Sequence, residues 1–269
     1  MKILLEYCQG CKKHINQDAY GYKDNFFWVI DGATDVFDNH YLSPLGDVYW
    51  IVQKLNNALK KGNTKSSLKE FVSAAIREVQ LEALAKVPNI NQIAINKLPT
   101  YAICCVKYTQ GFLEYLCLGD CSLFISKSPT TRYTDTRIQP FHLQVNEVKE
   151  QYKNNSEQYR AHVLEIVREI KNFINIENGY WIGILDPNIV EHAIIGNVEI
   201  EEKDRFVICS DGFRPSIDEA NLIYFESKDI FIRAKLQTIL EQQNLEENNY
   251  LLKTGIDISD DKTVLLVEI

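Results

Sequence analysis

The sequence predicts an α+β domain built around a mainly antiparallel sheet. Short apolar runs occur early and late in the chain, with amphipathic helical patterns between and after them. The clearest strand is Phe26–Ile30, five consecutive apolar residues that are too few for a buried helix and suit a strand covered on both faces. With 269 residues, the chain is long enough for one large domain, and no internal repeat divides it. We therefore expect a single domain over residues 1–269.

The remaining elements follow from turn residues and hydrophobic periodicity. Strands are expected at 2–8, 15–22, 26–30, 100–108, 112–118, 121–126, 179–184 and 197–209 and at the end of the chain, and helices at 44–61, 66–86 and 228–243. The helix at 66–86 has an apolar stripe, and Ser67 stands three residues before Glu70, which is the pattern of a capping box. Residues 127–178 are mostly polar, and only Val163–Ile174 suggests a helix, so we interpret this segment as an insertion or flap.

Composition excludes several functions. The net charge of −8, with no block of lysine and arginine to offset it, argues against nucleic-acid binding. No apolar stretch approaches the roughly 18 residues of a membrane span, and the first residues carry no signal-peptide pattern. Seven cysteines, several of them inside apolar runs, are typical of free thiols in a reducing cytoplasm. The sequence therefore predicts a cytoplasmic protein that binds neither membranes nor nucleic acids.

Cys8 and Cys11 form a lone C-x-x-C pair. A zinc site would need a second pair, for which Cys117 and Cys121 are poorly spaced, and a thioredoxin-type redox site would need a helix directly after the pair. A metal or redox role for this pair is therefore the less favoured alternative to two ordinary thiols.

Aspartates recur where the apolar strands end or begin. Asp31 and Asp211 each end a strand and precede a glycine, Asp120 follows another strand, and Asp260 precedes the last one. One Asp-Gly alone would indicate only a turn. Because the end of one antiparallel strand lies beside the start of its neighbour, these carboxylates can gather at one rim of a sheet. Clustered carboxylates repel unless a cation lies between them, and oxygen ligands favour Mg²⁺ or Mn²⁺.

With these residues the chain resembles the metal-dependent type 2C serine/threonine protein phosphatases in their compact bacterial form. The matching motifs, in chain order, are Asn16-Gln17-Asp18, Asp31-Gly32, Thr100 before Ala102-Ile103, Gly119-Asp120 followed by Ser122, Ser210-Asp211-Gly212 and Asp260-Asp261-Lys262-Thr263. Each motif alone is weak, but their order makes the set specific. The resemblance covers about 13–35, 99–126 and 179–269, and the family also has a variable flap where residues 127–178 stand.

The resemblance implies an α-β-β-α sandwich of two stacked antiparallel sheets that hydrolyses phosphoserine and phosphothreonine in proteins, in opposition to a kinase. Asp31 would bridge two Mn²⁺ or Mg²⁺ ions, the Gly32 carbonyl would bind one of them, and Asp211 and Asp260 would complete the other. Asp120 would help to bind a third ion. Asp18 would hold metal-bound water, and a hydroxide shared by the metals would attack phosphorus in line.

Three positions depart from the family pattern. Lys13 stands where the family has a phosphate-binding arginine, and it offers a point charge in place of a bidentate fork. Gln17 replaces a glutamate ligand found in many members, a change that is common in bacterial ones. Ala33 replaces a histidine proposed as general acid; His14 is close in sequence, although a lone histidine is more often structural.

Two other functions remain open at this point. A catalytically weak or inactive relative could use the fold as a binding module, although such a module has no reason to keep clustered charge. A metal phosphodiesterase or nuclease would need histidine ligands and a basic groove, and none of the five histidines adjoins these aspartates.

Overall fold

The computed structural model describes residues 1–37, 39–125, 130–213, 215 and 229–269. Its strands are β1 (Lys2–Gln9), β2 (Asp18–Lys23), β3 (Phe26–Gly32), β4 (Tyr101–Thr109), β5 (Phe112–Leu118), β6 (Ser122–Ile125), β7 (Thr131–Tyr133), β8 (Ile194–Glu199), β9 (Arg205–Cys209) and β10 (Lys262–Glu268). Its longer helices are α1 (Asp47–Lys61), α2 (Leu68–Lys86), α3 (Gln139–Tyr152), α4 (Ser156–Ile170) and α6 (Asp229–Thr254).

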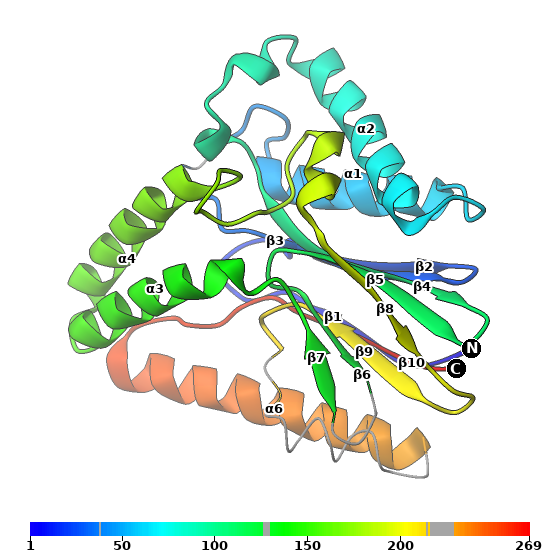
Figure 1. The fold of residues 1–269 in the computed structure, drawn as a ribbon. Coiled ribbons are helices and arrows are strands. Elements are labelled where there is room, and N and C mark those ends of the chain that lie inside the picture. Colours follow the sequence, from blue (N-terminus) through cyan, green and yellow to red (C-terminus); the bar gives the residue numbers. More distant parts are fainter. Residues whose placement is uncertain (38, 126–129, 214, 216–228) are drawn as a thin grey trace.

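Two five-stranded antiparallel sheets stack face to face, as the resemblance implied. One sheet has the order β2-β3-β4-β5-β8 and the other β1-β10-β9-β6-β7. Helices α1 and α2 cover the outer face of the first sheet, and α6 covers the outer face of the second (Figure 1). Strand β1 pairs with β10, so the two ends of the chain lie side by side. The expected α-β-β-α sandwich is confirmed.

Strand β3 is buried on both faces. Phe26, Trp28 and Ile30 pack against α1 and α2, whereas Phe27 and Val29 pack between the two sheets. The Trp28 indole Nε1 donates a hydrogen bond of 2.9 Å to Asn56 Oδ1 of α1, which satisfies its only polar group. The run of apolar residues predicted this double burial, and it fixes the position of the residues that follow, Asp31 and Gly32.

Helix α2 begins with the predicted capping box. Glu70 N donates to Ser67 Oγ at 3.3 Å, and Ser67 N donates to Glu70 Oε2 at 2.9 Å. The apolar stripe of this helix, which includes Phe71 and Ile76, faces the first sheet. Stacking of Phe71 on Phe26, with ring centroids 4.1 Å apart, joins the helix to β3.

The expected strand at 179–184 is wrong. Tyr180 and Gly183 each form only an isolated bridge, to Ile174 and Tyr101 respectively. The expected strand at 197–209 is two strands in different sheets, because a turn closed by Asp204 N and Glu201 O separates β8 from β9. The expected strand at 121–126 and the expected helix at 228–243 each include one residue, 126 and 228, that lies outside the described residues.

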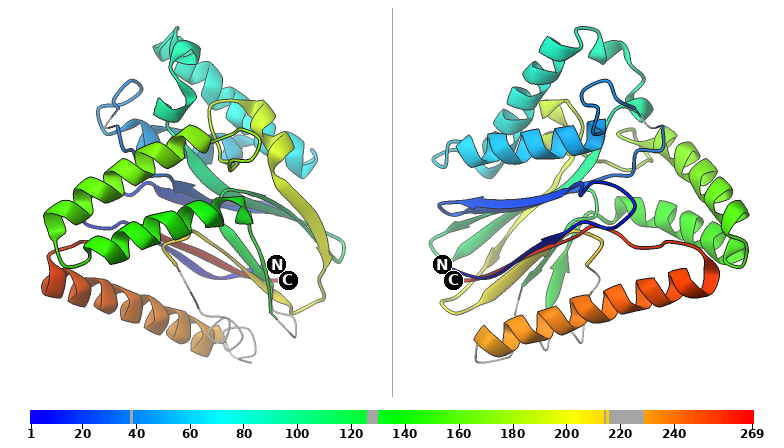
Figure 2. Two further views of the ribbon diagram at one scale, coloured as in Figure 1. Left: turned by 60° about the vertical axis from the view of Figure 1, so that its left-hand side comes forward. Right: turned by 180° about the vertical axis from the view of Figure 1, so that it is seen from behind.

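The segment 127–178 contains more regular structure than its sequence indicates. It includes β7, α3 and α4, whereas only one late helix was expected. Helices α3 and α4 lie side by side at one end of the sandwich, and not on the outer face of either sheet (Figure 2). None of the residues of α3 is buried, which explains why its sequence lacks a clear apolar stripe.

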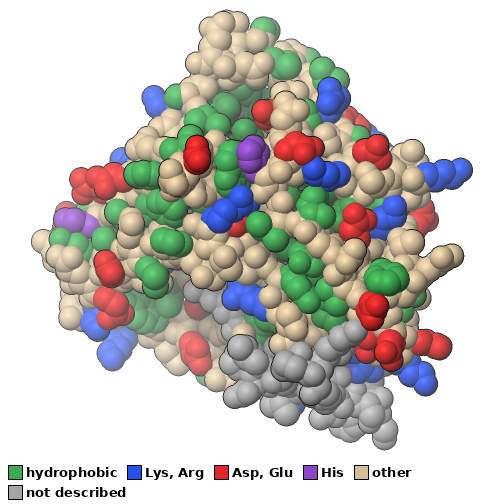
Figure 3. Space-filling view, viewed as in Figure 1, with side chains coloured by type: hydrophobic (Ala, Val, Ile, Leu, Met, Phe, Trp, Pro, Cys, Tyr) green, Lys and Arg blue, Asp and Glu red, His purple; other side chains and the backbone are tan. Residues whose placement is uncertain are grey.

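The described surface carries a mixture of charges. In the view of Figure 3, acidic and basic side chains are interspersed around small apolar areas. Among the described residues, no helix is both long and apolar enough to cross a membrane.

Candidate functional site

A cavity of about 540 Å³ opens at the end of the sandwich where α3 and α4 lie. All five residues that the sequence suggested as metal ligands line it: Asp31, Gly32, Asp120, Asp211 and Asp260. Residues of α3 and α4 line it as well. The segment interpreted as a flap therefore shares a cavity with the acidic end of the sandwich.

The pleat of β3 explains how these carboxylates meet. Side chains alternate along a strand, so Asp31 points to the same side as Phe27 and Val29, into the space between the sheets. Asp18 lies directly opposite Asp31 in the β2–β3 pairing. From the other sheet, Asp211 N approaches Asp31 Oδ2 at 3.3 Å.

The aspartates were expected at one rim of one sheet, and this expectation needs correction. Asp31 lies at the end of β3 and Asp120 follows β5, both in the first sheet, whereas Asp211 and Asp260 adjoin β9 and β10 of the second. The sequence shows that strands end in aspartate, but it does not show how the strands divide between sheets. The cluster is therefore assembled across the sandwich.

The metal-free cluster is electrostatically unfavourable. Burial, followed by the negative charges of Asp18, Asp211, Asp120 and Asp260, raises the pKa of Asp31 well above its ordinary value. A site that penalises the ionised form of its own carboxylates in this way is suited to bind cations, which would remove the penalty.

Asp18, the partner of Asp31 in the β2–β3 pairing, is only 3% exposed and is not among the described residues that line the cavity. Burial raises the pKa of Asp18 from 3.8 to about 8, although hydrogen bonds from Ser210 and Thr263 oppose the rise. Its Oδ2 atom is buried and has no hydrogen-bond partner among the described residues. A buried carboxylate oxygen without a partner is costly, which indicates that a water or another ligand group belongs beside it.

Two glycines bring the backbone into close contact at the site. A Cβ on Gly32 would lie 2.5 Å from Val48 Cγ1, and Gly32 N donates a hydrogen bond of 3.1 Å to Gln17 O. A Cβ on Gly212 would lie 1.9 Å from Asp261 O, closer than any side chain can approach. The Asp-Gly pairs therefore serve close packing around the carboxylates, beyond making turns.

Lys13 is not among the described residues that line the cavity. It lies in the loop between β1 and β2, where its side chain is exposed. His14 belongs to the same loop and likewise does not line the cavity. The structure thus brings the predicted aspartates together but leaves the predicted phosphate-binding lysine apart from them.

The segment 127–178 supplies polar groups that the sequence did not single out. Arg132 of β7 lines the cavity, and its Nε and Nη2 donate to Ser122 Oγ at 3.0 and 2.9 Å. His142 Nε2 of α3 lies 3.3 Å from Asp120 Oδ2. Lys171, directly after α4, is 5% exposed, and burial lowers its pKa. Nothing in the spacing of this polar segment showed that it folds back over the aspartates.

No protein family model and no curated protein matches the sequence. Solved structures do match. A serine/threonine phosphatase of S. agalactiae is 16% identical, with 98% of each chain covered and a TM-score of 0.59. The PPM Ser-Thr phosphatase MsPP of Mycobacterium smegmatis is 14% identical, with 100% of each chain covered and a TM-score of 0.56. The catalytic domain of PstP, solved with two manganese ions, is 14% identical, with 98% of this chain and 96% of that chain covered and a TM-score of 0.57. The chain therefore has the fold of the PPM serine/threonine phosphatases.

Proposed function

We propose that this protein is a metal-dependent phosphatase that hydrolyses phosphoserine and phosphothreonine in proteins. One observation carries the proposal: in a fold shared with PPM phosphatases, Asp31 is placed among four other aspartates from both sheets at the mouth of a cavity. Intact clustered charge favours an enzyme over a phosphatase-like binding module, because it has a cost that a bound cation would offset.

The donor groups fit two divalent ions. We assign Asp31 to both ions, the Gly32 carbonyl to one, and Asp211 and Asp260 to the other, with Asp120 contributing to a third. These are oxygen donors, the ligands that Mn²⁺ and Mg²⁺ prefer. The raised pKa of Asp31 supports the assignment, and PstP, of the same fold, is solved with two manganese ions.

Bound divalent ions supply Lewis-acid charge that activates water and stabilises phosphoryl transfer. The protein supplies the positioning. Asp18 presents the unpaired Oδ2 atom, which can accept a hydrogen bond from water and orient it. The hydroxyl groups of Ser210 and Thr263 hydrogen-bond Asp18, so its carboxylate is fixed between the sheets. His142 Nε2 lies 3.3 Å from Asp120 Oδ2, so its imidazole stands at the edge of the site.

Arg132 is the best placed group to bind the substrate phosphate. Its two bonds to Ser122 hold the guanidinium at the cavity wall and use two of its five N–H groups. An arginine offers the bidentate geometry that phosphate favours. Lys13, exposed in the β1–β2 loop, would then be the weaker phosphate-binding cation. The substrate is a phosphorylated protein, and a serine/threonine kinase would supply it in the cytoplasm.

The test is hydrolysis of a phosphothreonine peptide by metal-free protein to which Mn²⁺ is returned. Activity should require Mn²⁺ or Mg²⁺, and EDTA should abolish it. Asp31→Asn keeps the shape but removes the charge shared by both ions, so turnover should fall at least about a thousandfold, or about 4 kcal/mol of barrier. Asp120→Asn is the matched control and should lose much less. Full activity of the metal-free protein, or normal turnover and two bound metals in Asp31→Asn, would refute the proposal.

A further inference from the structure

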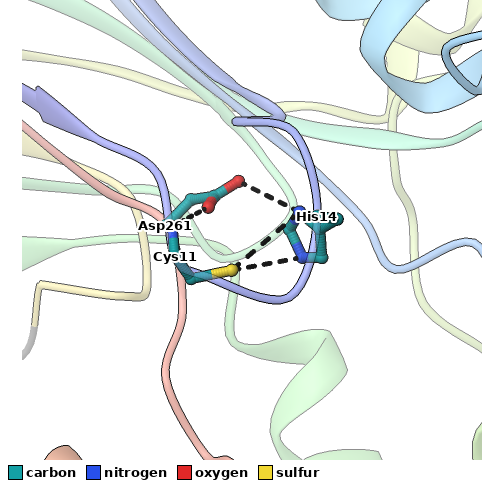
Figure 4. A group of neighbouring side chains, drawn as sticks. All are labelled: Cys11, His14 and Asp261. Carbon is teal, nitrogen blue, oxygen red and sulfur yellow. Dashed lines mark hydrogen bonds and ion pairs between the residues drawn. The ribbon is translucent and has the colours of Figure 1, made fainter.

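A second cluster of ligand-type side chains lies beside the loop between β1 and β2. Cys11 and His14 of this loop approach Asp261, the residue just before β10 (Figure 4). The Cys11 Sγ–His14 Nε2 distance is 3.6 Å, and the His14 Nδ1–Asp261 Oδ2 distance is 3.7 Å. One ligand atom from each residue lies within 4.8 Å of the other two. We call these three residues the Cys11–His14–Asp261 cluster.

The loop is held in this shape by the same carboxylate. Asp261 Oδ1 accepts a hydrogen bond of 2.7 Å from Cys11 N, and Oδ2 accepts one of 2.7 Å from Gln17 N. Asp261 is 4% exposed, so both bonds are shielded from water. A carboxylate has about four lone-pair positions, and two remain for another partner. The backbone of the loop is thus ordered before any ligand binds.

The imidazole of His14 has a defined donor side. Its Nδ1 lies 2.9 Å from Ile15 O, and a carbonyl can only accept, so Nδ1 carries the proton. Cys11 Sγ lies 3.6 Å from Nε2 and 4.0 Å from Nδ1, which places the sulfur beside the ring, so the imidazole would turn for the Nε2 lone pair and the sulfur to face one ion. A metal-binding histidine commonly has this arrangement, with one ring nitrogen bound to a backbone carbonyl and the other to the metal.

We propose that the Cys11–His14–Asp261 cluster is a binding site for a divalent ion of the zinc class, with a fourth position left to water. Thiolate and imidazole favour Zn²⁺ over Mn²⁺ or Mg²⁺. Zn–S and Zn–N bonds of about 2.3 and 2.0–2.1 Å at a tetrahedral angle separate sulfur and nitrogen by about 3.6 Å. Cys11 Sγ and His14 Nε2 already have this spacing, so binding requires a change in the orientation of the imidazole and not in its distance from the sulfur. The thiol proton passes to solvent as the ion binds.

Cys8 is not part of the site, although it forms the C-x-x-C pair with Cys11. Its sulfur contacts Asn16 Nδ2 and Thr263 Oγ1, both at 3.2 Å, and it lies outside the cluster. The protein ligands besides Cys11 are therefore a histidine and an aspartate, His14 and Asp261. The proposal is independent of the phosphatase activity, because Asp260, and not Asp261, lines the cavity.

The experiment is titration of the full-length, metal-free protein with Co²⁺, followed by absorbance. A bound thiolate should give a near-ultraviolet sulfur-to-cobalt charge-transfer band, which the oxygen-only active site cannot produce. One equivalent of Zn²⁺ should remove the band. Cys11→Ser should abolish it, and His14→Asn should weaken Co²⁺ binding by at least about tenfold. Cys8→Ser, the matched control in the same pair, should keep it.

The readout separates this site from the active site. Loss of the band with retained phosphatase activity in Cys11→Ser supports the proposal. A parent protein that gives the band but has no phosphatase activity refutes only the proposed phosphatase function. A folded parent with no band overturns the proposal. Persistence of the band in Cys11→Ser, or its loss in Cys8→Ser, overturns the assigned ligands. Circular dichroism confirms that each variant is folded, and Asp261 is left intact because it also orders the loop.

Discussion

Asp18→Asn should change how the stability of the metal-free protein depends on pH. Burial raises the pKa of Asp18 from 3.8 to about 8 in the folded protein. Between these values the unfolded chain has released the proton and the folded protein still holds it. Unfolding therefore releases one proton, and the free energy of unfolding falls as pH rises.

The size of the effect follows from this difference. One proton per molecule corresponds to about 1.36 kcal/mol for each pH unit, so Asp18 should remove about 3 kcal/mol of stability between pH 5 and pH 7. Asparagine cannot ionise, and Asp18→Asn should lose this part of the slope. An amide nitrogen placed at the position of the unpaired Oδ2 costs about 1–3 kcal/mol, but this cost is independent of pH and does not affect the slope.

The assay is urea unfolding in EDTA at pH 5, 6 and 7 for the parent and Asp18→Asn. Saturating Mn²⁺ should flatten the slope of the parent, since bound cations favour the ionised carboxylate. Asp257→Asn is the control. Burial raises the pKa of Asp257, but hydrogen bonds from Ser259 outweigh burial and lower it overall, so its titration lies below this pH range. If the free energy of unfolding in EDTA has the same pH dependence in the parent and in Asp18→Asn, the raised pKa of Asp18 and the reasoning from it are wrong.

Two further predictions concern substrate binding and backbone packing. Arg132→Ala should lower kcat/KM for a phosphopeptide by about ten- to a hundredfold, since a charge-assisted contact contributes roughly 1.5–3 kcal/mol, with Mn²⁺ affinity unchanged. Lys13→Ala should have the smaller effect because, unlike Arg132, Lys13 is not among the described residues that line the cavity. A larger loss in Lys13→Ala than in Arg132→Ala would assign the phosphate to Lys13. Gly212→Ala should destabilise the protein by about 1–3 kcal/mol or more and weaken Mn²⁺ binding in calorimetric titration, because its Cβ would lie 1.9 Å from Asp261 O. A Cβ on Gly111 would lie 3.9 Å from Ile200 O, an ordinary contact, so Gly111→Ala should leave Mn²⁺ binding unchanged. Equal losses of Mn²⁺ affinity in Gly212→Ala and Gly111→Ala would contradict the steric argument.

The fold was largely predictable because its signals are local. The apolar run of β3 and the capping box of α2 each depend on residues close in sequence, and both are confirmed. The division of strands between the sheets was not predictable, since pairing partners such as β1 and β10 lie at opposite ends of the chain. The strand expected at 179–184 failed because a short apolar run does not reveal whether a neighbouring strand is available to pair with it.

The candidate site shows the same limit. The aspartates could be identified because each stands at the end or start of an apolar run, which fixes its place in the fold. Arg132 and His142 could not be identified, because their positions depend on how 127–178 folds back over the sandwich. The approach of His14 to Asp261 joins positions far apart in sequence, so the C-x-x-C pair pointed to Cys8 where the structure places a histidine beside Cys11.

The division of the aspartates between two sheets would make the packing of the sandwich a determinant of affinity at the proposed metal site. Each sheet is held by backbone hydrogen bonds, but the separation of Asp31 from Asp211 depends on side chains between the sheets, such as Val29, Phe27 and Phe206. Interiors are densely packed and transmit small displacements. Altered packing in this layer would therefore shift the two halves of the proposed metal site relative to each other. Substitutions in the core would then change metal affinity, and with it the proposed activity, while every proposed ligand is retained.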